Sequence, residues 1–531
     1  MKTLRQLFVD FPFYYPPDLS DVPVGGISID SRQVKGGDLF VAMRGGSSDG
    51  HRFIPHAIQN GASCIVGDEP VEAGPVPYIQ VADARQALSW LAAAFYDWPA
   101  RKLTMIGITG TDGKTTTSNI LFQILRAAGL QAGMISTVNA VIGSQVLDTG
   151  FHVTTPDAHN VQDYLSRMVE AGATHAILET TSHGWAQHRV DACEFDIGVV
   201  TNITHEHLDE HGSYENYRAA KARLFSSLEI TRPKSRGNPR LAILNRDDAS
   251  FPFLDAFARV NKINYGLSEG ADLRAVEIRE DRYGTQFYAA TKDLRVAIES
   301  TLLGKYNISN CLAALAAAVF GAGIAPEAAA SGIAAFSGVP GRMESIDMGQ
   351  DFTAIVDFAH TPNALKVTLE EARRILGLTA KTSKAKPRLI SVFGSAGLRD
   401  RAKRRLMAET SVEFADLSIF TAEDPRTESL SAILDEMGEA ASARMAVEGK
   451  TFWRISDRGE AIKFAVSLAR AGDIVLACGK GHEQSMCFGV TEYPWDDRIA
   501  MKAALAGHLG IAGPEMPYLP SRDRSEAEWL R

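Results

Sequence analysis

The sequence predicts an α/β fold built from three domains, and two observations support this prediction. The chain has 531 residues, which is more than a single hydrophobic core usually serves. Along its length, short apolar runs alternate with stretches whose apolar residues recur at helical spacing. This alternation is typical of mostly parallel sheets covered by helices. We place the domains at residues 1–100, 101–340 and 341–531.

The strand-like runs fall into three groups that follow these boundaries. The second group begins with a run that leads into a Gly-rich turn, and the third reads as a separate doubly wound domain. The segment RPKSRGNPR (232–240) is expected to be a loop. In chain order the runs are GISID, DLFVAM, SCIVGD and YIQVAD; then LTMIGITG, AGMIST, HAILET, FDIGVVT and LAILN; and finally TAIVDFA, RLISVFGS, LSIFTAE and DIVLACGKG.

Composition indicates a soluble protein of the cytoplasm. Hydrophobic residues make up 45% and charged residues 22% of the chain, and the net charge of −9 argues against nucleic acid as a partner. The five cysteines form no CxxC pair, so neither a zinc site nor a disulfide framework is expected. The first residues contain an acidic side chain and prolines where a signal peptide needs an apolar stretch. No run reaches the roughly 18 apolar residues of a membrane span, so no membrane insertion is expected.

The sequence GITGTDGKTTT (107–117) predicts a phosphate-binding loop between a strand and a helix. Glycines let the backbone curl until several N–H groups face one phosphate, and the helix N-terminus adds partial positive charge. Lys114 would reach the outer phosphates and the Thr115 hydroxyl a magnesium ion. Asp112 is unusual beside phosphate, and capping of the helix is the alternative reading. The candidate nucleotide-binding residues are Gly110, Thr111, Asp112, Gly113, Lys114, Thr115 and Thr116.

Two further strands end in polar side chains that could hold a metal ion. Glu179 ends one strand, and the other leads into a segment dense in acidic and imidazole groups, from His205 to His211. Ligands sit at the carboxyl ends of strands in open α/β sheets. Oxygen and imidazole ligands from two such ends could hold magnesium beside the phosphates. Each histidine alone would more often be a surface or capping residue, but together with the phosphate loop a site is favoured.

The phosphate loop and the segments that follow it resemble those of the Mur ligases. The phosphate turn resembles their GTxGKT loop. The runs TTPD, ETTSH with Gln187 and Arg189, and TNITHEHLDEHG are similar to the central domain of the member that adds the third peptide residue. In YRAAKARLF, Lys221 matches a lysine that the family carbamylates, which would turn a cation into an anion able to hold a second magnesium. From this chain alone, Lys221 would be an ordinary lysine of an amphipathic helix.

The resemblance covers nearly the whole chain in the family's order. Residues 30–62 are similar to the uridine-nucleotide domain, and LGKYNISNCLAALA, GVPGRMESI and VDFAHTPNAL resemble ATP-contacting motifs. VFGSAGLRDRAKR, AEDPRTE and ACGKGHE resemble the pocket for the third residue. The resemblance implies ATP-binding roles for Asn307, Arg342 and Asp357; UDP-substrate roles for Ser31, Thr154, Thr155, Ser182, Gln187 and Arg189; and amino-acid roles for Arg399, Asp424, Arg426, Gly479 and Glu483.

The implied reaction is ATP-dependent amide-bond formation. ATP phosphorylates the carboxylate of a UDP-N-acetylmuramoyl dipeptide, and a diamino acid attacks the acyl phosphate. Catalysis then consists of positioning and electrostatics around the transferred phosphoryl group. Glu179 and His207 are expected to ligate one magnesium ion and Thr115 another, while carbamylated Lys221 places the acyl phosphate. His360 is a candidate general base, with a structural hydrogen bond as the alternative.

The choice of amino acid stays open between two readings. Enzymes of the family that add meso-diaminopimelate carry DNPR, whose Arg binds the distal carboxylate as a planar fork. Here the run is Glu423, Asp424, Pro425 and Arg426. The retained Arg426 favours diaminopimelate, whereas the extra carboxylate favours lysine or ornithine. A folylpolyglutamate-synthetase-like ligase and a non-catalytic nucleotide-binding regulator are weaker alternatives, and a monomer is expected.

A second departure lies in the metal segment. Glu206 stands where the family usually has Asp before the histidine of the metal site. The longer Glu side chain would change the contacts that surround the metal ligands.

Overall fold

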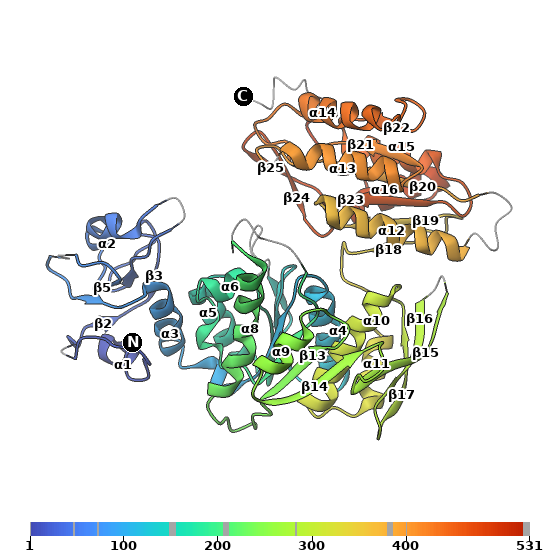
Figure 1. Ribbon diagram of the computed structural model, residues 1–531. Helices are drawn as coiled ribbons and strands as arrows, with labels where there is room; N and C mark the ends of the chain where they lie inside the picture. The colour runs from blue at the N-terminus through green and yellow to red at the C-terminus, as the bar shows by residue number, and fades with distance from the viewer. Residues whose placement is uncertain are drawn as a thin grey trace. The chain divides into compact units, whose positions relative to one another are not determined.

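The computed structural model describes residues 2–17, 19–45, 48–71, 74–147, 155–204, 212–281, 284–379, 386–399 and 401–523 (Figure 1). Contacts between residues divide the chain into two compact units. The first comprises Met1–Arg279, Thr285–Ser300 and Lys305–Phe336, and the second comprises Glu280–Gly284, Thr301–Gly304 and Ser337–Arg531. None of the described helices is both long enough and apolar enough to cross a membrane.

The N-terminal part of the first unit is built on a four-stranded parallel sheet in the order β3-β4-β5-β6. Each of the four apolar runs predicted here contains one of these strands. Helix α3 begins where the Asp83 side chain accepts a hydrogen bond from the Gln86 N–H, and its apolar face packs into the core under the sheet. The elements are β1 Lys2–Thr3, α1 Leu4–Leu7, β2 Pro23–Val24, β3 Ile27–Ser28, β4 Leu39–Val41, η1 Gly50–Phe53, α2 Ile54–Gln59, β5 Cys64–Gly67, β6 Tyr78–Gln80 and α3 Ala84–Phe95.

The central part carries an 11-stranded sheet in the order β10-β9-β8-β11-β7-β12-β13-β14-β15-β16-β17. Strands β8, β11, β7, β12 and β13 run parallel, as the sequence predicts, and β14 and β15, which were not predicted, continue the parallel order. The five predicted strands are buried almost throughout because helices cover them, with α4 against β7, β8 and β11 and α8 against β7, β12 and β13 (Figure 1). The strands are β7 Thr104–Thr109, β8 Ala132–Ile135, β9 Ala140–Ile142, β10 Gln145–Leu147, β11 His175–Glu179, β12 Ile197–Val200, β13 Leu241–Asn245, β14 Asn261–Gly266, β15 Leu273–Asp281, β16 Gly284–Ala290 and β17 Arg295–Ser300.

The antiparallel edges of this sheet were not predicted. Strand β9 pairs with β8 and β10, and β16 with β17, all antiparallel. Buried and more exposed side chains alternate along β16 and β17, so one face packs and the other meets solvent. The helices of this part are η2 Pro99–Lys102, α4 Lys114–Ala127, α5 Ala158–Glu170, α6 Ser182–Ala186, η3 Asp191–Cys193, α8 Tyr214–Ile230, α9 Phe251–Phe257, α10 Lys305–Ala316, the π-helical η4 Ala317–Gly321 and α11 Pro326–Ala334.

The second unit is a six-stranded sheet in the order β18-β19-β23-β20-β21-β22, parallel except for β18. Because β23 lies between β19 and β20, the carboxyl ends of these strands form the switch point at which such folds bind ligands. The doubly wound prediction is confirmed. The elements are β18 Glu344–Ile346, β19 Thr353–Asp357, α12 Pro362–Thr379, β20 Leu389–Phe393, α13 Arg401–Phe414, β21 Leu417–Phe420, α14 Leu430–Ala443, β22 Phe452–Arg454, α15 Arg458–Leu468, β23 Ile474–Cys478, β24 Ser485–Phe488, β25 Thr491–Pro494 and α16 Asp497–Leu509.

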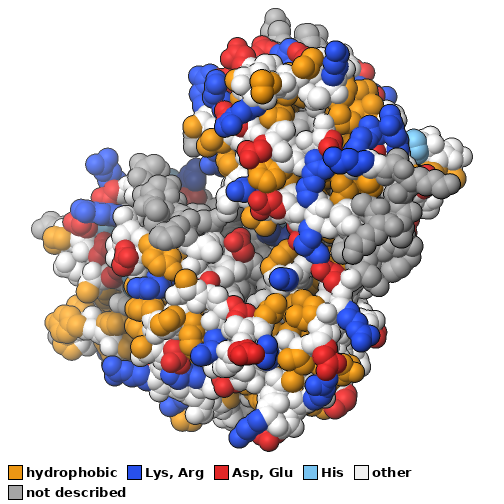
Figure 2. All heavy atoms as spheres, turned by 45° about the vertical axis from the view of Figure 1, so that its right-hand side comes forward, with side chains coloured by type: hydrophobic (Ala, Val, Ile, Leu, Met, Phe, Trp, Pro, Cys, Tyr) orange, Lys and Arg blue, Asp and Glu red, His pale blue; other side chains and the backbone are white. Residues whose placement is uncertain are grey.

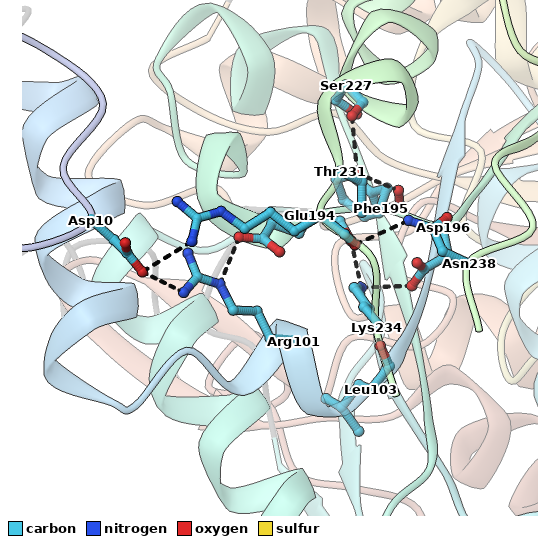
Figure 3. A network of polar contacts seen from close by, with 11 residues as sticks. Asp10, Arg101, Leu103, Glu194, Phe195, Asp196, Ser227, Thr231, Lys234 and Asn238 are labelled. Atoms are coloured by element: carbon cyan, nitrogen blue, oxygen red, sulfur yellow. Dashed lines mark hydrogen bonds and ion pairs between the residues drawn. The ribbon is translucent and has the colours of Figure 1, made fainter. Parts of the chain in front are cut away.

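A buried polar network closes the amino ends of β7 and β12 (Figure 3). Lys234 lies in the segment after α8, which is a loop as predicted, and it donates to the Leu103 carbonyl at 3.2 Å and to the Glu194 carbonyl at 2.6 Å. It also pairs with Asp196 Oδ2 at 2.6 Å, and both side chains are almost fully buried. The network therefore pins the carboxyl end of α8 to the sheet.

The same end of the sheet is tied to the N-terminal part of the unit. Arg101 lies between two acidic side chains, with Asp10 at 2.6 Å and Glu194 at 2.8 Å (Figure 3). Arg232 reaches the same Asp10 carboxylate at 3.2 Å. Two arginines lower the pKa of Asp10 through hydrogen bonds and charge, which keeps its carboxylate ionised.

Candidate active site

The predicted phosphate loop lies between β7 and α4, and glycine is required at two of its positions. Gly110 has φ +148° and Gly113 has φ +80°, which are backbone conformations that other residues rarely adopt. A Cβ at Gly110 would overlap the Thr201 hydroxyl, and one at Gly113 would overlap the Asn310 amide. The loop is thus held close to its neighbours, with the N-terminus of a 14-residue helix behind it.

Residues that follow β12 brace this loop through its backbone. The Thr201 hydroxyl donates to the Asp112 carbonyl at 2.6 Å, and the Asn202 amide oxygen accepts from the Asp112 N–H at 2.9 Å. Gly113 is the residue that precedes α4, and no side chain caps that helix end, so the reading of Asp112 as a helix cap is wrong. Sequence analysis missed Asn202, although its position directly after a buried strand was a usable signal.

Two lysines from different helices converge on the loop. The Lys114 ammonium donates to the carbonyls of Gly110 at 3.0 Å and Thr111 at 2.8 Å. Lys221, from α8, reaches the same Gly110 carbonyl at 2.6 Å although its residue is only 2% exposed. Its nitrogen also lies 4.5 Å from the ring centroid of Tyr217. The structure therefore brings these two predicted residues together, 107 positions apart in the sequence.

The donor set beside the loop fits a magnesium ion. Glu179 is fully buried at the end of β11, and its Oε2 accepts from the hydroxyls of Thr115 at 3.1 Å and Thr137 at 2.9 Å. A carboxylate beside hydroxyl oxygens is a ligand set that magnesium prefers. Within the described ranges no three His, Cys, Asp or Glu side chains gather into a metal group. The predicted His207 and its segment, residues 205–211, lie outside the described residues.

Predicted substrate residues gather next to Glu179. Arg189 donates to the Thr155 carbonyl at 2.6 Å and to the Gln187 side-chain oxygen at 2.7 Å. The Thr155 hydroxyl in turn donates to the Glu179 carbonyl at 3.0 Å. Ser182 begins α6 and is buried beside them. This chain of hydrogen bonds places three of the predicted substrate residues against the strand that ends in the metal-site carboxylate, whereas Thr154 lies outside the described residues.

Ser31 belongs to a separate cluster in the N-terminal part of the unit. Its hydroxyl lies 3.0 Å from His56 Nδ1, and its carbonyl accepts from the Asn60 amide at 2.8 Å. These contacts hold the turn after β3 against α2.

Asn307 reaches the phosphate loop through a neighbour one helical turn away. Its side-chain oxygen accepts from the Asn310 amide at 3.1 Å, and Asn310 in turn accepts from the Thr117 hydroxyl of α4 at 3.3 Å. Asn310 was not singled out in the sequence, although it shares the buried face of α10 with Asn307.

In the second unit, Asp357 organises the backbone at the end of β19. Its carboxylate accepts from the N–H groups of Met343 at 2.7 Å and Ala359 at 2.8 Å, and from the Thr368 hydroxyl at 3.1 Å. The Arg342 guanidinium carbon lies 5.3 Å from the Phe358 ring centroid. The two predicted ATP residues of this unit and the candidate base His360 thus lie at one strand end. His360 Nδ1 donates to the Phe358 carbonyl at 3.0 Å. A structural hydrogen bond of this kind is the alternative to the role of His360 as a general base.

Residues predicted to bind the incoming amino acid lie together after the ends of β21 and β23. Asp424 Oδ1 accepts from the Lys480 ammonium at 3.0 Å and from the Cys487 N–H at 2.9 Å. Lys480 also pairs with Glu483 Oε2 at 2.5 Å. Burial works to lower the pKa of Lys480, but its two acidic partners outweigh burial and raise it, so the lysine is charged. Lys480 lies within the ACGKGHE run, and its role was not predicted from the sequence.

Backbone strain marks the same pocket. Asp424 and Arg426 have φ values of +40° and +54°, in the left-handed region that residues other than glycine rarely adopt. The β24–β25 hairpin holds them, since the Arg426 N–H donates to the Cys487 carbonyl at 3.1 Å and Gly489 donates to the Arg426 carbonyl at 2.8 Å. Such strain clusters at ligand sites, where the surrounding structure imposes it. Gly479, at φ +113°, adjoins this turn, while Arg399 is exposed in the loop after β20.

Comparison with known proteins agrees with this arrangement. Family models match residues 23–96 as the Mur ligase family catalytic domain, 108–318 as the Mur ligase middle domain and 341–481 as the Mur ligase glutamate ligase domain. The chain is 41% identical over 513 residues to a UDP-N-acetylmuramyl-tripeptide synthetase of Roseiflexus sp. (strain RS-1), covering 94% of this chain and 98% of the relative. The chain belongs to the Mur ligase family.

Other Mur ligases extend the likeness. A UDP-N-acetylmuramoyl-L-alanyl-D-glutamate–2,6-diaminopimelate ligase of Geobacillus kaustophilus (strain HTA426) is 39% identical over 505 residues, covering 95% of this chain and 99% of the relative. A solved structure of a ligase with the same name has a TM-score of 0.68 and 30% identity, and covers 96% of this chain and 100% of that one. As a Mur ligase, the protein is an ATP-dependent ligase with a three-domain α/β fold.

Proposed function

We propose that this protein adds meso-diaminopimelate to UDP-N-acetylmuramoyl-L-alanyl-D-glutamate, using ATP and magnesium, in the cytoplasmic stage of peptidoglycan synthesis. Full-length relatives at 38% to 39% identity carry this activity in their names. The phosphate loop with Lys114, the oxygen cluster at Glu179 and the strained pocket at Arg426 are the parts that such a reaction needs. We expect the active protein to be a monomer.

The first half of the reaction belongs to the first unit. The D-glutamyl carboxylate is a poor electrophile, so it attacks the γ-phosphorus of ATP to give an acyl phosphate and ADP. Lys114 would neutralise charge on the transferred phosphoryl group, and Thr155, Gln187 and Arg189 would orient the nucleotide substrate. Magnesium ions, one held by Glu179 and His207 and another by Thr115, would supply further neutralisation of phosphate charge.

Lys221 has a distinct role in this proposal. Carbon dioxide adds to its amine with loss of a proton, and the resulting carbamate replaces a cation by an anion next to the phosphate loop. The amine is buried and lies 2.6 Å from the Gly110 carbonyl, so the anion would form where a second magnesium ion can meet the phosphates. The incoming amine then attacks the acyl carbon, and phosphate leaves.

One observation supports diaminopimelate over lysine or ornithine. The argument for lysine rests on Asp424 as an extra negative charge in the pocket, but its Oδ1 atom is paired with the buried Lys480 at 3.0 Å. The positive charge of Lys480 offsets the negative charge of Asp424, so Asp424 does not act as an extra negative charge on an incoming amino acid. The Arg426 fork then remains for a distal carboxylate, which lysine and ornithine lack.

The test is phosphate release from ATP in the presence of UDP-N-acetylmuramoyl-L-alanyl-D-glutamate and one amino acid at a time. We expect turnover with meso-diaminopimelate that exceeds turnover with L-lysine or L-ornithine by at least about 100-fold, as a missing charged partner in a pocket predicts. Preference for lysine or ornithine would refute the reading of the pocket. Absence of turnover with all three amino acids would refute the proposed function and leave the family assignment standing.

A further inference from the structure

Glu423 and Asp424 are adjacent acidic residues of the proposed amino-acid pocket, and their side chains have different surroundings. Asp424 has the Lys480 ammonium at 3.0 Å and a backbone N–H at 2.9 Å. Glu423 is more deeply buried, at 5% exposed, and its Oε2 atom is shielded from solvent without a hydrogen-bond partner among the described residues. A Cβ added to Gly479 would lie 2.7 Å from that oxygen, so Oε2 faces the turn after β23 in the pocket.

Three cations lower the pKa of Glu423 by their charge, and two of them, Arg458 and Lys480, are paired with other carboxylates. Arg458 pairs with Asp497 through two hydrogen bonds, at 2.7 and 2.6 Å, and gives its remaining contacts to the carbonyls of Ala422 and Cys478. Lys480 is shared between Asp424 and Glu483. Lys403, on α13, acts on Glu423 only as a nearby charge. None of the three is hydrogen-bonded to Glu423 Oε2, which has no partner among the described residues.

Burial therefore decides the state of this carboxyl group. Removal from water raises the pKa of Glu423 to about 7, against the attraction of Lys403, Arg458 and Lys480 and with a further upward contribution from Asp424. An isolated carboxylate in such a place would cost far more than a neutral acid.

We propose that Glu423 is a specificity-determining residue, kept protonated in the folded pocket so that Arg426 is not opposed by a second uncompensated carboxylate. Ionisation of Glu423 would add one negative charge to a pocket that already holds Asp424 and Glu483. That added charge would oppose binding of a distal carboxylate and favour a side chain that ends in an ammonium group alone. The inference deepens the proposed function and rests on it.

The first experiment measures discrimination as a function of pH. The ratio of kcat/KM for meso-diaminopimelate to that for L-lysine is determined from pH 6 to pH 8.5 in the wild type and in Glu423→Gln. We expect the wild-type ratio to fall roughly tenfold or more as pH rises through about 7, the size expected for one added charge in a partly desolvated pocket. The Gln side chain has the same shape and no proton to lose, so its ratio should stay flat.

The second experiment does not depend on turnover. The melting temperature of Glu423→Gln relative to the wild type is followed from pH 5 to pH 8. The folded pKa of Glu423 is raised above that of the unfolded chain, so the folded state holds a proton that the unfolded state has lost. The wild type should therefore lose stability relative to Glu423→Gln as pH rises across this range and level off above about pH 7.

Glu428 provides the matched control. Its hydrogen bond to Arg404 lowers its pKa to about 2, so it stays ionised across the whole range. The melting-temperature difference between Glu428→Gln and the wild type should not change from pH 5 to pH 8. Infrared spectra of the wild type test the same claim without any variant. The band of a protonated carboxyl group should disappear as the pH rises through neutrality.

The outcomes separate the two claims. If the wild type turns over none of the amino acids, the proposed function fails while the melting and infrared experiments still test Glu423. If diaminopimelate is turned over but Glu423→Gln shows the pH-dependent ratio and the melting profile of the wild type, the inference is overturned. A missing infrared band would overturn it even if the variant did not fold.

Discussion

Replacement of Lys234 by Met should destabilise the first unit strongly. The side chain keeps its length and apolar stem, but its ammonium, which has three partners within hydrogen-bond distance, is lost (Figure 3). Asp196 then remains as a fully buried carboxylate whose Oδ2 atom retains only the Met105 N–H at 2.7 Å. Removal of one partner from a buried ion pair typically costs about 3–5 kcal/mol. At about 2–4 °C per kcal/mol for a large domain, the melting temperature should fall by roughly 6–20 °C.

The pKa directions of the pair predict a partial rescue. Burial raises the pKa of Asp196 and lowers that of Lys234, so desolvation outweighs the attraction between the two charges. The double variant Asp196→Asn/Lys234→Met removes both charges and keeps an oxygen that can accept from the Met105 N–H. It should recover at least about half of the loss seen in Lys234→Met, because no uncompensated charge stays buried.

Differential scanning calorimetry of the full chain is the assay, and Lys292→Met is the matched control. The Lys292 side chain is 89% exposed in the turn between β16 and β17, so its replacement should change stability by no more than about 0.5 kcal/mol. A Lys234→Met protein that melts within about 1 °C of the control would refute the reasoning. A double variant less stable than the single one would refute the predicted rescue, because it would show that the lone Asp196 carboxylate is not the source of the lost stability.

Three further predictions concern the site. Lys114→Met should weaken ATP binding about 10- to 150-fold, as loss of a charge-assisted contact worth about 1.5–3 kcal/mol predicts, and titration calorimetry with ATP would contradict this by showing an unchanged Kd. Lys221→Arg should be as inactive in phosphate release as Lys221→Ala, since a guanidinium forms no carbamate, and an active Arg variant would exclude that role. Burial lowers the pKa of His482 to about 4, so between about pH 6.5 and pH 4 the unfolded chain binds a proton that the folded protein does not. The wild type should then lose up to about 3 kcal/mol as pH falls through that window, whereas in His482→Gln melting curves this loss should be absent.

Local patterns were sufficient for the central strands of the two large sheets. The buried strands β7, β11 and β12 appear in the sequence as continuous apolar runs because helices cover their faces. The outer strands of the 11-stranded sheet, β9 and β10 on one side and β14 to β17 on the other, were missed. In β16 and β17 buried and exposed residues alternate, and the pairing of such strands is decided by their neighbours in the sheet. The helix-capping reading of Asp112 failed for a similar reason, since Thr201 and Asn202, about 90 positions away, determine what its backbone contacts.

The sequence by itself determined the phosphate loop, because Gly110, Gly113, Lys114 and Thr115 are contiguous and their chemistry depends on one local turn. The tertiary structure alone decided how charge is balanced in the amino-acid pocket. Asp424 meets Lys480, 56 positions away, whereas the Oε2 atom of the adjacent Glu423 has no hydrogen-bond partner among the described residues. Two neighbouring acids look alike in a sequence, but their charge states depend on burial and on partners that only the folded chain brings together.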